Sequence, residues 1–169
     1  MQDSRGAAIL KGMPAVLTAP AVLPQVAIRR ATASDLPVIL SLLQELGPNE
    51  EPLPLPRARE IFARMQALPR MWVWIAERDA TPVGTYTLLI MDNLCHAGTP
   101  SAIVESVVVA SEARGGRIGE VMMRHAMERA RDAGCYKLAL SSNGRRLEAH
   151  RFYRRLGFAP HGISFSIAP

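Results

Sequence analysis

The sequence predicts a mixed α/β domain in which a central, mostly antiparallel sheet carries helices on both faces. Strands are indicated by short apolar runs, often β-branched, at 71–78, 83–91 and 102–109. Apolar residues at three- and four-residue spacing indicate two helices before these strands and two after them. A strand at 135–141 follows the helix of 118–133, and such a crossover places its two strands parallel. The sheet is therefore mixed.

The folded domain is expected to span residues 25–169. Residues 1–24 mix glycine, alanine, proline and short apolar residues without a period, which predicts a flexible leader. This segment also lacks the basic start and long apolar region of a clear signal peptide.

The domain is expected to begin with one strand and two helices. Gln25–Arg30 predicts the strand, and Ala33-Ser34-Asp35 supplies an N-cap for a helix that ends at Gly47. Four prolines in Pro48–Pro56 predict a loop. Pro56 suits the first turn of the second helix.

The rest of the chain predicts a meander, a crossover helix and a final helix. Asp79–Pro82 joins the strands on either side of it as a hairpin, and Ala102–Val109 adds the third strand. Gly134 closes the crossover helix, and Arg146–Leu156 forms the last helix. Phe158–Ile167 predicts one or two short strands, so we expect six to seven strands and about four helices.

The positive charge is spread along the chain. The formal net charge is +5 and the sequence pI is about 9.9, which raises the possibility of nucleic-acid binding. The arginines are scattered, however, with no Lys/Arg block and few aromatic residues to stack on bases. Solvated helix faces plus an anionic small ligand are favoured over a specific nucleic-acid partner.

Other composition features exclude several classes of protein. No apolar run approaches the roughly 20 residues that span a bilayer, so no membrane association is expected. Cys95 and Cys135 form no CxxC pair, which favours a reduced cytoplasmic chain. The four histidines lack ligand spacing with acidic neighbours, so no metal site is expected.

The segment Ala102–Gly134 contains a buried strand, a glycine-rich turn with two arginines and a long amphipathic helix. This order places unpaired backbone N–H groups next to a helix N-terminus, which carries partial positive charge. Such a turn suits a phosphate or pyrophosphate.

With its later segments, the chain resembles the GNAT superfamily of acetyl-CoA-dependent N-acetyltransferases over about 26–167. VVVASEARGGRIG resembles the family's acetyl-CoA loop, GCYKLAL the strand after the crossover helix, and AHRFYRRLGF the helix Ala-x-x-Phe-Tyr-x-x-x-Gly-Phe. The run IVESVVV has a local likeness to the branch of glucosamine-phosphate N-acetyltransferases and their bacterial relatives. The resemblance implies the GNAT fold, a V-shaped splay between the parallel strands, acetyl-CoA as cofactor and a homodimer.

Two positions depart from the family pattern. Arg117 stands where the acetyl-CoA loop usually has glycine, and Gly116 lies one place early. Arg146 aligns with an asparagine that often precedes the Phe-Tyr helix, while Asn143 lies three residues upstream. The second departure weakens the case for an asparagine contact to the cofactor.

The resemblance implies a set of cofactor-binding residues in three segments. The strand edge holds the amide-rich pantetheine arm, the loop holds the pyrophosphate, and a bulge where the strand splays from its parallel neighbour opens the slot for the thioester. A plainer interpretation makes the valines core residues and the loop an ordinary helix start. The residues are Val107, Val108, Val109, Arg114, Gly115, Gly116, Arg117, Ile118, Gly119, Glu120, Asn143 and Phe152.

Acetyl transfer to an amine requires a base for the amine proton and a donor for the departing thiolate. By resemblance Tyr153 is the acid, and the alternative is a helix tyrosine that anchors the core. Glu105 is the candidate base or water-polariser because it interrupts an apolar strand, although it can equally face outward and pair with an arginine. Lesser candidates are His150, Ser106 and Asn143.

The expected function is transfer of the acetyl group of acetyl-CoA to a primary amine of a small molecule, by direct attack through a tetrahedral intermediate. Arg145, Arg146 and His96 either face an anionic substrate or are solvated charges. The alternative is a non-catalytic acyl-CoA sensor or partner-binding module of the same fold. Thiol release with a panel of amines separates the two, and steep salt dependence without a cofactor effect would indicate nucleic-acid binding.

Overall fold

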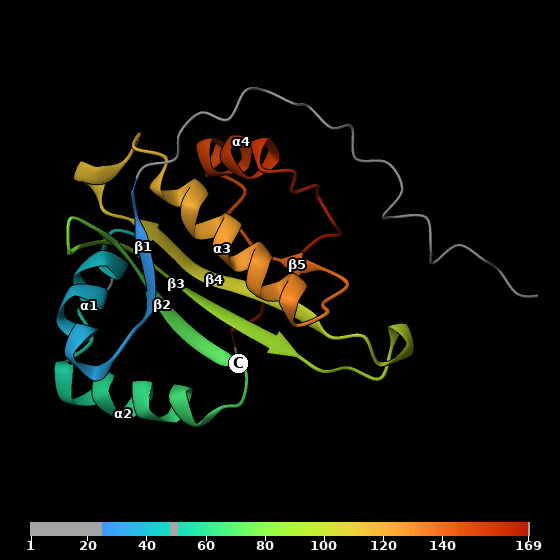
Figure 1. The fold of residues 1–169 in the computed structure, drawn as a ribbon, viewed down its shortest axis with the longest axis horizontal. Helices are drawn as coiled ribbons and strands as arrows, with labels where there is room; N and C mark the ends of the chain where they lie inside the picture. Colours follow the sequence, from blue (N-terminus) through green and yellow to red (C-terminus); the bar gives the residue numbers. More distant parts are fainter. Residues whose placement is uncertain (1–24, 48–50, 169) are drawn as a thin grey trace, which may run out of the picture.

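A five-stranded sheet forms the centre of the molecule in the computed structural model, which describes residues 25–47 and 51–168 (Figure 1). The strand order follows the sequence, and every neighbouring pair is antiparallel except the last, β4 with β5. The strands are β1 (Ala27–Arg30), β2 (Met71–Arg78), β3 (Thr81–Met91), β4 (Ser101–Val109) and β5 (Leu138–Ala139).

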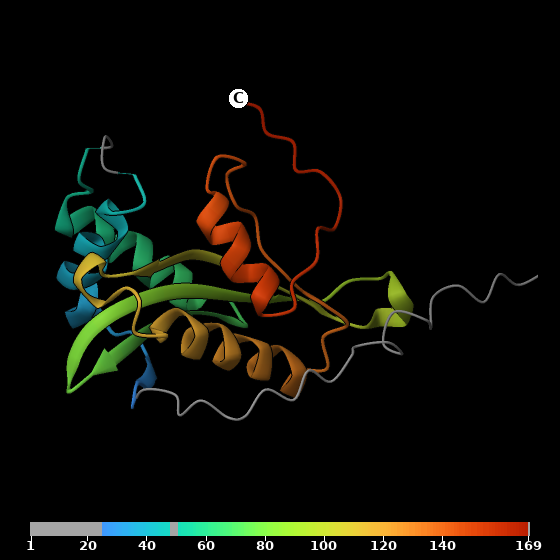
Figure 2. The ribbon, with the colours of Figure 1, turned by 90° about the horizontal axis from the view of Figure 1, so that it is seen from above.

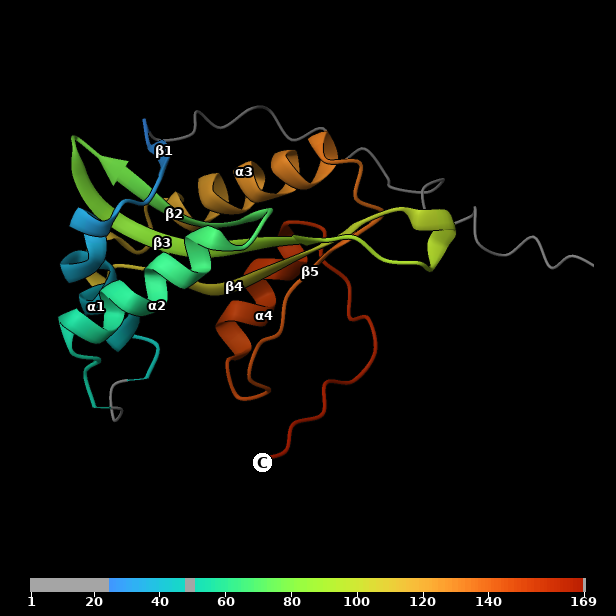
Figure 3. The ribbon, with the colours of Figure 1, turned by 90° about the horizontal axis from the view of Figure 1, so that it is seen from below.

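Helices cover both faces of this sheet, as the sequence predicts. Figures 2 and 3 show α3 on one face and α1, α2 and α4 on the other. The predicted mixed α/β class is confirmed. The helices are α1 (Leu36–Gln44), α2 (Leu55–Ala67), α3 (Ile118–Asp132) and α4 (Leu147–Arg155).

The apolar core is divided between the two faces. The larger cluster packs α3 against the sheet, with Met122 and Met123 fully buried beside residues of β3 and β4. The smaller cluster joins α1, α2 and β2 around Phe62 and Ile75. Both faces of the central strands are thus removed from water, which is the main stabilising term for a sheet of this kind.

Two sequence predictions about strands are wrong. The sheet has five strands among the described residues rather than six to seven, and Phe158–Ile167 contains none. The segment has the alternating pattern of a strand, but Gly157 and Gly162 have positive φ and Pro160 lacks a backbone donor. No strand edge pairs with it in the chain described, so the pattern alone does not make a strand. The predicted leader, 1–24, lies outside the described residues.

The two parallel strands separate after a very short ladder. Only Ala102 with Leu138 and Ile103 with Ala139 are in register, so β5 is much shorter than the predicted strand at 135–141. Beyond Ile103, β4 continues to Val109 with no neighbouring strand on that side among the described residues. The predicted splay is present, and it leaves a strand edge open along the second half of β4.

A charged network fixes β1 to the start of α1 and to β2. The Arg29 guanidinium donates to both carboxylate oxygens of Asp35, at 2.8 and 2.7 Å, and to Glu77 at 2.7 Å. The Thr32 N–H donates to Asp35 at 2.7 Å, so Thr32 and Asp35 form a capping box ahead of α1. The hydrogen bonds from Arg29 hold the pKa of the Asp35 carboxyl well below its ordinary value.

Replacement of Asp35 with alanine is expected to lower the free energy of unfolding by about 2 kcal/mol, because charged hydrogen bonds to a buried carboxylate are lost. Folding lowers the pKa of Asp35. Its contribution to the free energy of unfolding is therefore complete above the unfolded pKa of about 4 and disappears as the pH falls from there towards the folded pKa. Urea unfolding at several pH values measures both effects. Arg57→Gln, which removes an exposed helix pair, is the control. Equal stability of Asp35→Ala and wild type at pH 7 would contradict this account.

Candidate active site

Backbone N–H groups at the start of α3 form a candidate anion site. Gly115 has a φ of +81° and Arg117 a φ of +58°, so the chain enters the left-handed region twice before α3 begins at Ile118. Within the part of the chain that the structure describes, the N–H groups of Gly115, Gly116, Ile118 and Gly119 have no protein acceptor. Successive donors at a helix N-terminus attract an anion such as a phosphate.

The two arginines of this loop are held by carboxylates of the same chain. Arg114 Nη2 lies 2.5 Å from Glu45 Oε2, at the end of α1, and Arg114 Nε donates to the Val109 carbonyl at 3.2 Å. Arg117 Nε donates to Glu120 Oε2 at 3.0 Å, and this bond is the main cause that lowers the pKa of Glu120. The loop therefore offers an anion chiefly its backbone donors.

Three of the residues singled out by sequence meet at Gly119. A Cβ at this position would lie 3.2 Å from Cζ of Phe152 on α4 and 3.7 Å from Cγ2 of Val109 on β4. Gly119 itself belongs to the first turn of α3. The end of β4, the start of α3 and the ring of Phe152 are thus adjacent, and a side chain at position 119 requires the Phe152 ring to move.

The predicted bulge is present in β4. Thr85 of β3 pairs with Val108, but Thr87 pairs with Glu105, so two β4 residues face one β3 residue. One of the two is Ser106, which has a φ of +54°. The bulge lies in the part of β4 that has separated from β5, and Glu105 and Ser106 are both exposed there.

The valines in and after the bulge alternate between core and surface. Val108 is 4% exposed and packs into the main core, whereas Val107 and Val109 are half-buried. The core interpretation thus holds for Val108. The main chain of this segment lies along the open edge of β4.

The Glu105 carboxylate acts electrostatically on the Tyr153 phenol. Burial raises the pKa of the Tyr153 phenol; the nearby Arg146 guanidinium lowers it and the Glu105 carboxylate raises it. The net shift is upward, so Tyr153 is protonated at neutral pH. Glu105 is exposed and makes no ion pair with any residue in the described ranges, so the predicted alternative of a pair with an arginine is not observed.

The end of α4 fixes the position of Tyr153. Gly157 has a φ of +92°, and its N–H donates to the Arg154 carbonyl while the Phe158 N–H donates to the Tyr153 carbonyl, both at 3.0 Å. This is a Schellman motif, and it brings the Phe158 ring against Tyr153 with centroids 5.7 Å apart. The centroids of the Phe152 and Tyr153 rings are 5.1 Å apart. Tyr153 is therefore half-buried and in contact with two aromatic rings.

Asn143 has a local structural role in the loop before α4. Its Oδ1 accepts from the Arg145 N–H at 2.9 Å, and its carbonyl lies 3.0 Å from Nε2 of His150. His150 thus holds this loop, while His96 stacks on Tyr136 in the loop region before β5.

Two residues near the loops were missed by the sequence interpretation. Glu45 anchors Arg114 and also accepts from the Ser111 N–H at 3.2 Å. Ser142 has a buried hydroxyl with no hydrogen-bond partner among the described residues. Neither residue type is diagnostic, and Glu45 is distant in sequence, so no local signal identifies them.

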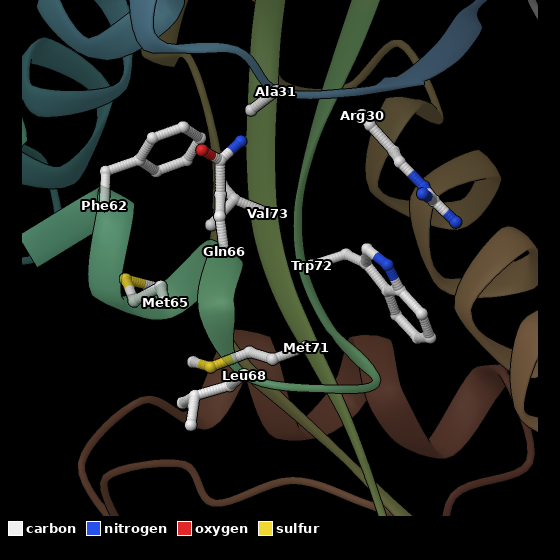
Figure 4. Close-up of a pocket in the computed structure, with 9 residues that line it drawn as sticks. All are labelled: Arg30, Ala31, Phe62, Met65, Gln66, Leu68, Met71, Trp72 and Val73. Atoms are coloured by element: carbon white, nitrogen blue, oxygen red, sulfur yellow. The ribbon is translucent and has the colours of Figure 1, made fainter.

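One cavity lies away from these residues. A cavity of about 170 Å³ opens between α2 and the start of β2. Figure 4 shows Phe62, Met65 and Gln66 of α2 on one side of it, and the Arg30–Trp72 pair on the other. None of the residues predicted to bind cofactor or substrate lines this cavity.

The described residues contain no cluster of histidine, cysteine and acidic side chains suited to a metal ion. Among these same residues, no helix combines the length and apolar character needed to cross a bilayer.

Comparison with known proteins identifies the family. The chain matches the model of the acetyltransferase (GNAT) family over residues 36–158, which include the open β4 edge, the glycine loop and α4. The chain belongs to this family. It is an acetyl-CoA-dependent N-acetyltransferase.

Individual relatives agree with this assignment. The aminoalkylphosphonate N-acetyltransferase of Salmonella typhimurium is 35% identical over 147 residues, which are 87% of this chain and 94% of the relative. Glucosamine 6-phosphate N-acetyltransferase 1 of Oryza sativa subsp. japonica is 28% identical over 131 residues, 76% of this chain and 77% of the relative. A solved structure from Agrobacterium tumefaciens str. C58 has a TM-score of 0.80 at 37% identity, covering 85% of this chain and 99% of that one.

Replacement of Gly119 with valine is expected to weaken acetyl-CoA binding at least tenfold, because the new side chain fills the space beside Phe152 and Val109. Isothermal titration with acetyl-CoA measures the affinity. The matched control is Gly144→Ala, since a Cβ at Gly144 meets nothing within 4 Å. An unchanged affinity in a folded Gly119→Val variant would place the cofactor elsewhere.

Proposed function

We propose that this enzyme acetylates the primary amine of a small molecule that also carries a phosphonate or phosphate group. The observation that supports catalysis here is that the Tyr153 phenol responds to two charges, Arg146 at the N-cap of α4 and Glu105 on the open half of β4. The names of two relatives support the acceptor class, since one acts on aminoalkylphosphonates and another on glucosamine 6-phosphate.

In this proposal the cofactor follows the open edge of β4 to the start of α3. The main chain at Val107–Val109 pairs with the amides of the pantetheine arm as an added strand would. The N–H groups of Gly115, Gly116, Ile118 and Gly119 bind the pyrophosphate. Arg114 and Arg117 stabilise this loop through their ion pairs with Glu45 and Glu120.

Glu105 is the proposed base and Tyr153 the proposed acid. Acetyl-CoA supplies an activated thioester. The amine nitrogen attacks the thioester carbonyl directly, and Glu105 accepts the proton that the nitrogen loses, through water where needed. As the carbon–sulfur bond breaks, the Tyr153 phenol donates its proton to the thiolate. The products are an N-acetylated amine and free coenzyme A, and the proton on Glu105 returns to Tyr153 through solvent.

Arg146 is the proposed partner of the acceptor's anionic group. It occupies the N-cap position of α4, is exposed, and acts electrostatically on Tyr153. An anion at this point would also face the positive end of α4. Arg145 precedes it and has no comparable effect on Tyr153.

The experiment measures thiol release with an aminoalkylphosphonate and with a matched amine that lacks the phosphonate. Tyr153→Phe and Glu105→Gln are expected to lower kcat by about 10² or more while leaving acetyl-CoA affinity unchanged. Arg146→Gln is expected to raise KM for the phosphonate alone, and Arg145→Gln is its control. Full activity in both Tyr153→Phe and Glu105→Gln would overturn the roles proposed here.

We also propose that the enzyme is a homodimer joined through its C-terminal segment. Ile163, Phe165 and Ile167 are 82%, 90% and 90% exposed and alternate with serines, so they would share one face if the segment paired as a strand. The outer edge of β5 has no partner in the chain described. A second copy fits both features, because its segment can add to this edge and cover the apolar face.

Light scattering after size-exclusion chromatography tests the dimer. The wild type is expected at twice its 18.5 kDa monomer mass, and the double variant Phe165→Ser, Ile167→Ser at the monomer mass. Leu94→Ser, which removes an equally exposed side chain outside the segment, is expected to remain dimeric. A monomeric wild type at high micromolar concentration would contradict the proposal.

A further inference from the structure

One hydrogen bond between polar side chains crosses the apolar layer between the sheet and α3. The Tyr86 hydroxyl lies 2.5 Å from Nδ1 of His125. Tyr86 is fully buried in β3, and His125 is half-buried on α3. A buried hydroxyl without an acceptor is costly, so this bond strongly favours one position of β3 relative to α3.

Tyr86 is also the β3 residue at the bulge. Its neighbours Thr85 and Thr87 pair with Val108 and Glu105, so Tyr86 is the residue that the two unmatched residues of β4 face. A shift of β3 by one residue would turn Tyr86 to the other face of the sheet and break its bond to His125.

The surroundings hold both rings in place. Trp74 of β2 contacts the His125 ring edge-on with centroids 4.5 Å apart and stacks on Tyr86 at 6.5 Å. Thr85 Oγ1 donates to the Trp74 carbonyl at 2.8 Å, which fixes the adjacent residue of β3 as well.

We propose that Tyr86 and His125 are a positioning pair for cofactor binding: their hydrogen bond holds the β4 bulge in register, and with it the strand edge at Val107–Val109. The inference rests on the proposed path of acetyl-CoA along that edge. Neither side chain is a catalytic residue, because both lie on the α3 face of the sheet and act through the backbone of β3.

The pair makes cofactor binding depend on the protonation of His125. A neutral His125 with its proton on Nε2 accepts the Tyr86 hydroxyl proton at Nδ1. A protonated ring can only donate to the Tyr86 oxygen, which leaves the buried Tyr86 O–H without an acceptor. Burial and the charge of Arg129 lower the pKa of His125, and Glu128 raises it. His125 lines a groove of about 500 Å³, whose charged lining residues are Arg124, Glu128 and Arg131. Val26, just before β1, and Ile28 of β1 line it from the sheet side. Arg30 of β1 lies over Trp74. Acetyl-CoA affinity should therefore fall as the pH drops below the folded pKa of His125.

The test measures acetyl-CoA affinity by isothermal titration from pH 5 to pH 8. Tyr86→Phe and His125→Leu are expected to weaken binding at least tenfold at pH 7.5, while Tyr136→Phe, a tyrosine outside the core pair, stays within twofold of wild type. His125→Asn keeps an amide oxygen in place of Nδ1 and cannot gain a proton, so it is expected to restore binding and to lose affinity less than wild type at pH 5. Variants are compared at each pH because the phosphates of the ligand also titrate.

Two results would overturn the positioning role: wild-type affinity in a folded Tyr86→Phe variant, or binding by His125→Asn that is as weak as that of His125→Leu. The conservative His125→Asn variant keeps the test valid if the others fold poorly. If Gly119→Val weakens binding and Tyr86→Phe does not, only this inference fails. If Gly119→Val binds normally, the proposed cofactor path fails instead.

Discussion

The separation of β4 from β5 is the constraint on which the rest of the site depends. The two strands share only two residue pairs, so the second half of β4 has main-chain groups that no neighbouring strand satisfies among the described residues. The parallel pairing also requires a crossover, and the crossover helix α3 follows β4 after a short 3-10 turn, Ser111–Ala113, and the glycine loop. The open strand edge and the N-terminus of α3 are thus joined by one short loop.

This arrangement explains why the loop needs glycine more than charge. Its arginines are already engaged by Glu45 and Glu120, whereas the N–H groups of Gly115, Gly116 and Gly119 have no acceptor in the chain described. Gly119 also lets α4 approach α3 through Phe152. The next residue of α4 is Tyr153, on whose phenol the Glu105 carboxylate acts electrostatically. Cofactor binding and acetyl transfer are thus both proposed to depend on the packing contact between Gly119 and Phe152.

Much of this was predictable from local patterns. Apolar periodicity predicts all four helices and the hairpin, and the glycine turn before Ile118 predicts the helix start, because these features depend on neighbouring residues. The error at Phe158–Ile167 has the opposite cause: a strand needs a partner, and the alternation of Ile163 and Phe165 carries no information about one. Glu45, Tyr86 and His125 were not recognisable, since their roles arise from contacts between segments 39 to 69 residues apart.

Hydrogen–deuterium exchange with and without acetyl-CoA tests the central claim most directly, because it measures the protection of the backbone N–H groups that are proposed to bind the cofactor. Slower exchange is expected in peptides that cover 104–120, with little change at the α2–β2 cavity, 62–73, or along the exposed face of α3, 121–131. Protection confined to either of those two regions, with none at 104–120, would contradict a cofactor path along the open edge of β4.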